Sequence, residues 1–197
     1  LWPSLWPPLL SDDLRFGARG AAPRRPIPFR EMGAAVRPIA RGLLALGVQP
    51  GDRLGIFAES RPEWALVDFA ILAVGGISVP IYATNVQHQA AYLVEETDMT
   101  VLFTGSQSNY DKAVALAVNA LALQHIIAFD DATTLSGENS RHLSDLMALG
   151  ADPATDGEID ARLSAASPHD PAPIVYPLSP IHTQPAPPAT SCRSRGA

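Results

Sequence analysis

Apolar residues recur at alternating intervals of three and four from residue 29 to residue 46, a spacing that places them on one face of a helix. The positions concerned are Phe29, Met32, Val36, Ile39, Leu43 and Leu46. Pro28 suits the first turn of this predicted helix, and Gly47 suits the residue after its end, where φ is positive. Pro38 lies inside it and should bend the helix axis, because proline removes one backbone hydrogen bond.

Four short apolar runs follow, each bounded by turn residues and spaced 23 to 25 residues apart. They predict buried strands at 54–58, 77–82, 101–103 and 126–129. Helical patterns at 60–74, 86–98 and 110–121 lie between the strands. This alternation is typical of βαβ units, in which helices cover a parallel sheet. The predicted fold class is therefore α/β, with alternating strands and helices that form part of a parallel sheet.

Individual helices carry further signals. Ser60 followed by Glu63 fits a capping box at the start of the second helix. That helix is apolar around nearly its whole circumference, which predicts burial. The third of these helical patterns rests on Tyr110, Val114, Val118 and Leu121 as one apolar face.

The pattern is weaker after residue 131. Short helices are expected at 143–149 and 159–163. Ala172–Tyr176 could begin a fifth strand, although prolines flank it. Residues 64–82 approach the length of a membrane span, but Asp68, Gly75–Gly76 and Pro80 favour a buried helix followed by a buried strand.

Proline is dense at both ends of the chain and sparse in the middle, and dense proline opposes helix interiors and central strands. We therefore expect three parts: an irregular leader at 1–27, a folded domain at 28–176, and a Pro/Ser/Arg-rich tail at 177–197 that is disordered or out of frame. The leader lacks the basic start and uninterrupted apolar core of a secretory signal, so the protein is not expected to be secreted.

Composition narrows the function classes. The formal net charge of −6 argues against a nucleic-acid partner, which normally meets a basic stripe. Cys192 is the single cysteine, which excludes a disulfide framework and a multi-cysteine metal site. The five histidines show no i,i+4 pair, so no metal site is predicted. They are His88, His125, His142, His169 and His182.

Three short segments could carry chemistry. Thr104–Ser106 follows a predicted strand, but a helix N-cap explains it better than a phosphate loop does, because the nearest lysine is Lys112. Asp130–Asp131 could bind a metal or a ribose, although an acidic turn is the commoner explanation. Tyr82, Thr84 and Asn85 follow the second strand and could line a substrate crevice or simply stabilise a loop. No G-x-S-x-G or G-x-G-x-x-G motif is present.

Several segments together resemble one family. They are Ile27–Met32, Arg41–Arg53, Phe57–Trp64, Leu72–Tyr82, and Thr84–Asn85 followed by Ala91–Leu93. In combination they resemble the N-terminal portion of the long-chain fatty acid–CoA ligases, members of the AMP-binding, adenylate-forming superfamily. The resemblance is close over residues 28–131 and loose over 132–176.

This resemblance implies an acid–thiol ligase that activates fatty acids in two steps. The fatty acid carboxylate attacks the α-phosphorus of ATP, which gives an acyl-adenylate and pyrophosphate, and the thiol of coenzyme A then displaces AMP. It implies ATP, Mg²⁺ and coenzyme A as reactants and cofactors, and a cytoplasmic location with peripheral membrane association left open.

The chain departs from the family pattern after Ile174-Val175-Tyr176. The family continues there with a Thr/Ser/Gly-rich phosphate loop that ends in lysine, whereas this chain continues Pro177-Leu178-Ser179-Pro180. A frameshift or truncation near Tyr176 would explain the change. We therefore expect no catalytic residues, no tight cofactor binding and no activity from this chain alone. A non-catalytic α/β ligand-binding or interaction module is the alternative, and uncovered apolar surface leaves self-association open.

Overall fold

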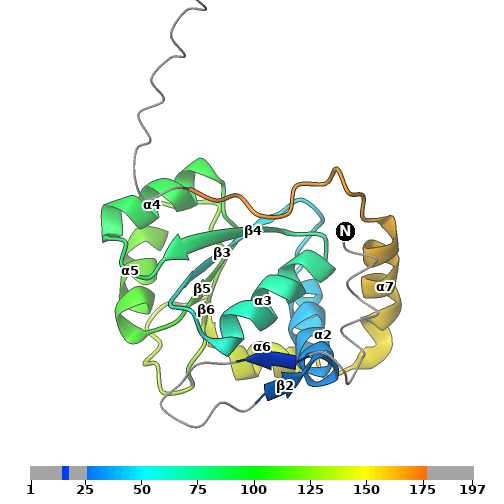
Figure 1. The fold of residues 1–197 in the computed structure, drawn as a ribbon. Helices are drawn as coiled ribbons and strands as arrows, with labels where there is room; N and C mark the ends of the chain where they lie inside the picture. Colours follow the sequence, from blue (N-terminus) through cyan, green and yellow to red (C-terminus); the bar gives the residue numbers. More distant parts are fainter. Residues whose placement is uncertain (1–14, 18–25, 177–197) are drawn as a thin grey trace, which may run out of the picture.

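A five-stranded parallel sheet forms the centre of the fold in the computed structural model, which describes residues 15–17 and 26–176. The strand order is β4-β3-β5-β6-β7 (Figure 1). The strands are β3 (Arg53–Ala58), β4 (Ile77–Tyr82), β5 (Val101–Thr104), β6 (His125–Ala128) and β7 (Ser140–His142). All four strand pairs are parallel, which confirms the predicted fold class.

Helices cover both faces of this sheet, as a parallel sheet requires. The helices are α2 (Phe29–Ala45), α3 (Pro62–Ala73), α4 (Gln87–Glu96), α5 (Gln107–Ala117), α6 (Leu143–Leu149) and α7 (Asp156–Ala165), with a 3₁₀ turn η2 (Pro153–Thr155) before α7. The helices α2, α3, α6 and α7 lie on one side, and α4 and α5 lie on the other (Figure 1).

The two helical layers bury opposite sides of the same strands. Leu54 and Ile56 of β3 belong to the core beneath α2 and α3, whereas Phe57 belongs to the core beneath α4 and α5. Successive strand residues point to opposite faces, so a strand that is apolar at nearly every position must be covered twice. This explains why the predicted strands are continuous apolar runs rather than alternating ones.

Most of the predicted elements lie within a few residues of the observed ones. Gly47 has φ of 86°, which confirms its place after the end of α2, and Pro38 lies inside α2. The apolar face predicted for the helix at 110–121 is wrong at its C-terminal end. Because α5 stops at Ala117, Val118 and Leu121 lie beyond it and are 78% and 96% exposed.

The predicted capping box is also wrong. Arg61, not Ser60, is the N-cap residue of α3, and its side chain makes no cap hydrogen bond. Pro62 occupies the first helical turn, where a missing N–H costs nothing. Glu63 pairs with the Arg61 guanidinium instead of returning to the backbone of Ser60.

Three further differences concern strands. β7 was not predicted, and Ala172–Tyr176 forms a single parallel bridge, Ser78 with Pro173, rather than a strand. Within the leader expected to be irregular, β1 (Arg15–Gly17) pairs antiparallel with β2 (Pro26–Pro28). The rest of the leader and the whole predicted tail at 177–197, with His182 and Cys192, lie outside the described residues.

None of the helices in the described ranges combines the length and hydropathy needed to cross a bilayer. The apolar stretch 64–82 is instead α3 followed by β4, as the sequence favoured.

Candidate functional site

The strand order reverses at β3, since the chain passes from β3 to β4 on one side and then crosses to β5 on the other. In open α/β sheets, ligands bind outside the carboxyl ends of the strands at such a reversal. The loops that reach this position are residues 59–61 after β3, 105–106 after β5 and 129–131 after β6. This edge of the sheet is therefore where a site is expected first.

The side chain of Arg61 fills the space at the point where the strand order reverses. Arg61 donates from both terminal nitrogens to the Asp130 carboxylate at 2.9 and 2.7 Å, and from Nη1 to the Gly105 carbonyl at 2.8 Å. Its Nε donates to Glu63 at 2.8 Å, and its guanidinium carbon lies 5.6 Å from the centre of the Phe129 ring. Arg61 thus joins the loops after β3, β5 and β6. We call Arg61, Glu63, Gly105 and Asp130 the Arg61 clamp.

The clamp shifts the pKa values of Arg61 and Asp130. The hydrogen bonds from Arg61 lower the pKa of Asp130, and the bond to Asp130 is the main reason that the pKa of Arg61 is raised. Both shifts favour the charged pair. Within this acidic turn, Asp130 is therefore the ion-pair partner of Arg61. Asp131, its neighbour, accepts a hydrogen bond from the Ser144 hydroxyl.

The segment Thr104–Ser106 starts α5 and does not form a phosphate loop. Ser106 is the N-cap residue, and its hydroxyl accepts a hydrogen bond from the Asn109 amide at 3.3 Å. A side chain at Gly105 would collide with Ala58, so the loops after β3 and β5 lie in direct contact. Asn109, which is buried, donates from its side chain to the Phe57 carbonyl. The predicted N-cap is confirmed.

Two hollows lie beside the carboxyl end of β4. The first, which we call the β4 hollow, has a volume of about 330 Å³ and lies between the loop after β3, with Trp64, and the end of β4, with Val175 at its rim. The second, the tyrosine hollow, has a volume of about 430 Å³. Its lining consists of Tyr82, Asn85, His88, Gln89, Tyr92, Leu93 and Tyr176.

The predicted crevice residues are divided between these hollows. Tyr82 lines both, Thr84 lines the β4 hollow, and Asn85 lines the tyrosine hollow. The three residues share one loop, but they do not line one common crevice. Their contact with a substrate stays a prediction.

Lys112 also reaches this loop, a connection that the sequence analysis missed. It lies on α5, donates from Nζ to the Asn85 carbonyl at 3.2 Å, and stands 5.6 Å from the centre of the Phe57 ring. The sequence separation between Lys112 and Asn85 conceals the pairing, which forms because α5 packs against α4, the helix that follows the Asn85 loop. The only lysine of the chain therefore supports the loop.

The segment that precedes the departure from the family pattern runs along the outer edge of β4. The Ser78 amide donates to the Ala172 carbonyl at 3.0 Å, and the Ile174 amide donates to the Ser78 carbonyl at 2.9 Å. The pairing ends there because Pro80, the next residue of β4 facing outward, has no N–H. Tyr176 then reaches the tyrosine hollow, where burial, with Glu96 and Tyr92 nearby, raises its pKa.

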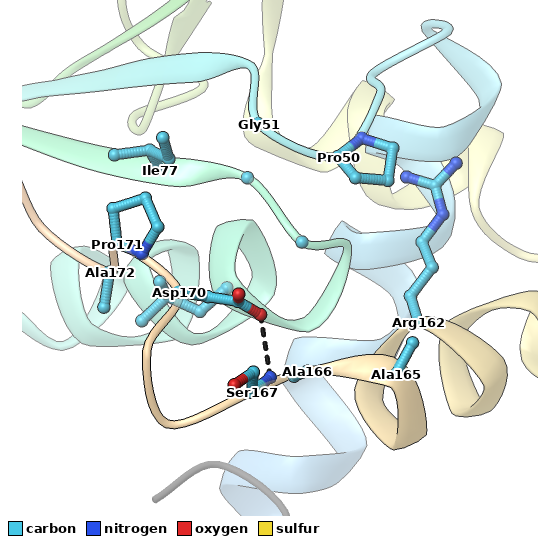
Figure 2. Close-up of a pocket in the computed structure, with 13 residues that line it drawn as sticks. Pro50, Gly51, Ile77, Arg162, Ala165, Ala166, Ser167, Asp170, Pro171 and Ala172 are labelled. Carbon is cyan, nitrogen blue, oxygen red and sulfur yellow. Dashed lines mark hydrogen bonds between the residues drawn. The ribbon is translucent and has the colours of Figure 1, made fainter.

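A third hollow, of about 420 Å³, lies at the opposite, amino edge of the sheet (Figure 2). Its walls are mostly small or apolar residues, and its charged groups are already paired. Arg162 donates to the carbonyls of Val48 and Val74 at 3.0 and 2.8 Å and to Glu158 at 2.6 Å. Asp170 accepts from the Ser167 amide at 2.7 Å, the bond dashed in Figure 2. The sequence analysis did not foresee this hollow.

No group of three or more histidine, cysteine, aspartate or glutamate side chains converges within the part of the chain that the structure describes. His142 contacts the Thr133 carbonyl through Nε2 at 3.0 Å. Burial, together with the nearby Arg141, lowers the pKa of His125.

Comparison with known proteins places this geometry in a family. The family model described as "AMP-binding enzyme" matches residues 18–176 and so extends into the segment expected to be a leader. The long-chain-fatty-acid–CoA ligases FadD15 of Mycobacterium bovis and Mycobacterium tuberculosis are each 38% identical over 143 residues, which is 72% of this chain and 22% of theirs. Fatty acyl-CoA synthetase A of Dictyostelium discoideum is 30% identical over 104 residues, 53% of this chain and 15% of that protein.

The fold has a counterpart among solved structures. The anthranilate CoA ligase AuaEII, in complex with anthranoyl-AMP, superposes with a TM-score of 0.57 at 22% identity, over 63% of this chain and 23% of that one. The chain spans about a fifth of the length of the FadD15 ligases that it matches. On these matches, the chain belongs to the AMP-binding enzyme family, as a partial match to its long-chain fatty acid–CoA ligases.

Proposed function

We propose that this chain is the opening portion of a cytoplasmic long-chain fatty acid–CoA ligase. In the complete reaction a fatty acid carboxylate attacks the α-phosphorus of ATP with release of pyrophosphate, and the thiol of coenzyme A then displaces AMP. The match of residues 18–176 to the family, together with 38% identity to two long-chain ligases, carries this proposal.

Within that reaction we assign this chain a scaffolding role. It supplies the strands that end at the carboxyl edge, and it brings Val175 and Tyr176 to that edge beside β4. Tyr82, Thr84 and Asn85 occupy the same edge, so we place the fatty acid or its adenylate on their side of the sheet. The Arg61 clamp keeps the neighbouring loops together and fills the reversal of strand order.

Among the residues that the structure describes, those at the carboxyl edge do not fit a triphosphate with its magnesium ion. Gripping phosphates needs free cations and backbone N–H groups in a glycine-rich loop. Arg61 is already held by two carboxylates, and Lys112 is engaged with the Asn85 carbonyl. Residues 177–182 contain neither glycine nor lysine. We therefore propose that the 197-residue chain does not activate fatty acids by itself.

Pyrophosphate release tests this proposal directly. The purified chain is incubated with ATP, Mg²⁺, palmitate and coenzyme A, beside a complete long-chain ligase as the positive control. We expect no pyrophosphate above the level without protein, and calorimetry should show no tight uptake of magnesium-ATP. A burst of pyrophosphate would overturn the assignment of this chain as an inactive portion.

The alternative is a non-catalytic α/β ligand-binding or interaction module. The Arg61 clamp fills the position where ligands of open α/β sheets bind, so it accords with an interaction module better than with a ligand site at that position. The DNA downstream of the codon for Tyr176 separates the two candidates. A glycine-rich phosphate loop and a distal lysine encoded there in any frame would support the ligase portion, and their absence would favour the module.

A further inference from the structure

The tyrosine hollow is an open aromatic surface. Tyr82 and Tyr92 are 43% and 57% exposed, and Tyr176 forms a third aromatic wall. Val86 and Val175, both about half exposed, belong to the same corner of the molecule at the end of β4 and the start of α4. Contiguous exposed apolar surface of this kind marks an interaction site more often than chance exposure does.

The rim of this surface is acidic. Glu95 and Glu96 lie exposed at the end of α4, whereas Asp98, which follows them, pairs with Arg53. Glu96 lies close enough to Tyr176 to influence the titration of its phenol. An occupant of the tyrosine hollow should therefore carry cations and no acids, because a negative charge at this rim would be repelled.

The chain itself continues from the wall of this hollow. Residues 177–197 follow Tyr176 and contain Pro185-Ala186-Pro187-Pro188, then Arg193 and Arg195, and no acidic residue. Proline-rich segments favour the polyproline II conformation. Segments in this conformation bind aromatic-lined grooves at low entropic cost. Three residues make one turn of that helix, so prolines 185 and 188 would share one face.

We propose that the segment Pro185–Pro188 docks in the tyrosine hollow against Tyr82, Tyr92 and Tyr176, with Arg193 and Arg195 beside the acidic end of α4. The connecting residues 177–184 are long enough to return the segment, because eight flexible residues span roughly 16 Å on average. The tether also makes docking intramolecular, with an effective concentration on the order of millimolar, so a weak aromatic contact suffices.

The single cysteine provides the test. Cys192 lies four residues beyond Pro188, and a nitroxide attached to it reports proximity without any engineered site. The full chain is isotopically labelled, and its amide signals are compared with the nitroxide active and reduced. We expect the amides of α4 to lose most of their intensity, while amides of α6, on the other face of the sheet, keep theirs.

Two variants separate docking from mere tethering. Tyr92→Ser changes an exposed wall of the hollow and should restore the α4 signals, whereas Val118→Ser, at an exposed position after α5, should leave them attenuated. Substitution of Pro185, Pro187 and Pro188 by serine changes none of the described residues and should restore the α4 signals as Tyr92→Ser does. Unchanged attenuation in that triple variant would show tethering alone and would overturn the proposal.

Mixed samples identify the source of the signal. Chains that carry the nitroxide but no isotope are mixed with isotope-labelled chains that carry no nitroxide. Docking within one chain predicts no attenuation in this mixture. Attenuation there would assign the hollow to a second copy of the chain, and absence of attenuation in every sample would mean that the segment does not dock; either result overturns the proposal.

Discussion

At the scale of single residues, Arg61 has the largest influence on the carboxyl edge. Its guanidinium joins three loops that are distant in sequence, and both of its acidic partners accept short hydrogen bonds. This arrangement could not be predicted, because an Arg-Pro-Glu sequence at a helix start shows nothing of Asp130, 69 residues away. Ser106 could be predicted as an N-cap, since its partner lies only three residues on.

Replacing Asp130 by asparagine should destabilise the protein by about 1 kcal/mol at neutral pH, because half-exposed charged pairs contribute modestly. Arg61 lowers the pKa of Asp130 in the folded state relative to about 3.9 in the unfolded state. The stabilisation is therefore present above pH 4 or so and is lost as the pH falls through the lower, folded pKa. Denaturant unfolding at a series of pH values measures the difference.

Asp131→Asn is the control, because it removes an adjacent charge and leaves the pair with Arg61 intact. The difference in unfolding free energy between Asp130→Asn and the unchanged chain should shrink as the solution becomes acidic. A difference that persists unchanged at acidic pH would show that the charge of Asp130 is not what stabilises the edge.

At the scale of elements, the sequence predicts the buried apolar strands and misses the short polar strand β7. The strands β3, β4, β5 and β6 are apolar runs covered on both faces, so their patterns are unmistakable. β7 reads Ser-Arg-His, is only half-buried and pairs on one side, so it lacks any hydrophobic signal. The same holds for the proline-containing strand β2, which pairs only with β1.

The crossing of α2 and α6 depends on Gly42. A methyl group there would collide with the backbone carbonyl and side chain of Leu146. Gly42→Ala should therefore destabilise the protein by about 1–3 kcal/mol, although alanine favours helices. Thermal or denaturant unfolding measures the loss.

Gly157→Ala in α7 is the matched control, because a methyl group at Gly157 meets no atom within 4 Å. It should leave stability unchanged or raise it slightly. If Gly42→Ala behaved like Gly157→Ala, the close approach of α2 and α6 would not be needed for stability.

Pro80 limits how far the chain can pair with the edge of β4. Ser78 bonds outward to Ala172 and Ile174, and Ile77 bonds inward to Asp52, so position 80 faces outward again. Pro80→Ala should supply the missing donor to the Ile174 carbonyl and extend the pairing toward Tyr176. Hydrogen exchange should then show a protected amide at position 80.

Pro62→Ala provides the comparison, because an amide in the first turn of α3 has no partner within the helix and should exchange quickly. Fast exchange at position 80 as well would show that another feature, and not the proline, ends the pairing.

At the scale of the whole molecule, the resemblance predicted the family and the parallel sheet, and the family match and the structure confirm them. The structure also shows where apolar surface is exposed. The burial expected for α3 is confirmed, since Val67 and Ile71 are fully buried in the core it shares with α2. The free edge at β7 is short and carries Arg141 and His142, features that oppose pairing between edges. The tyrosine hollow, of which the sequence marked only Tyr82 and Asn85, is the described surface best suited to association.

Self-association and docking of the tail would then compete for the same surface. The chain should associate weakly, and the triple change of Pro185, Pro187 and Pro188 to serine should increase association, because it uncovers Tyr82 and Tyr92. Sedimentation velocity over a range of concentrations measures this. Adding Tyr92→Ser to the triple variant should return it toward the monomer, whereas adding Val118→Ser should not. Equal association of the triple variant and the unchanged chain would show that the tyrosine hollow is not the contact surface.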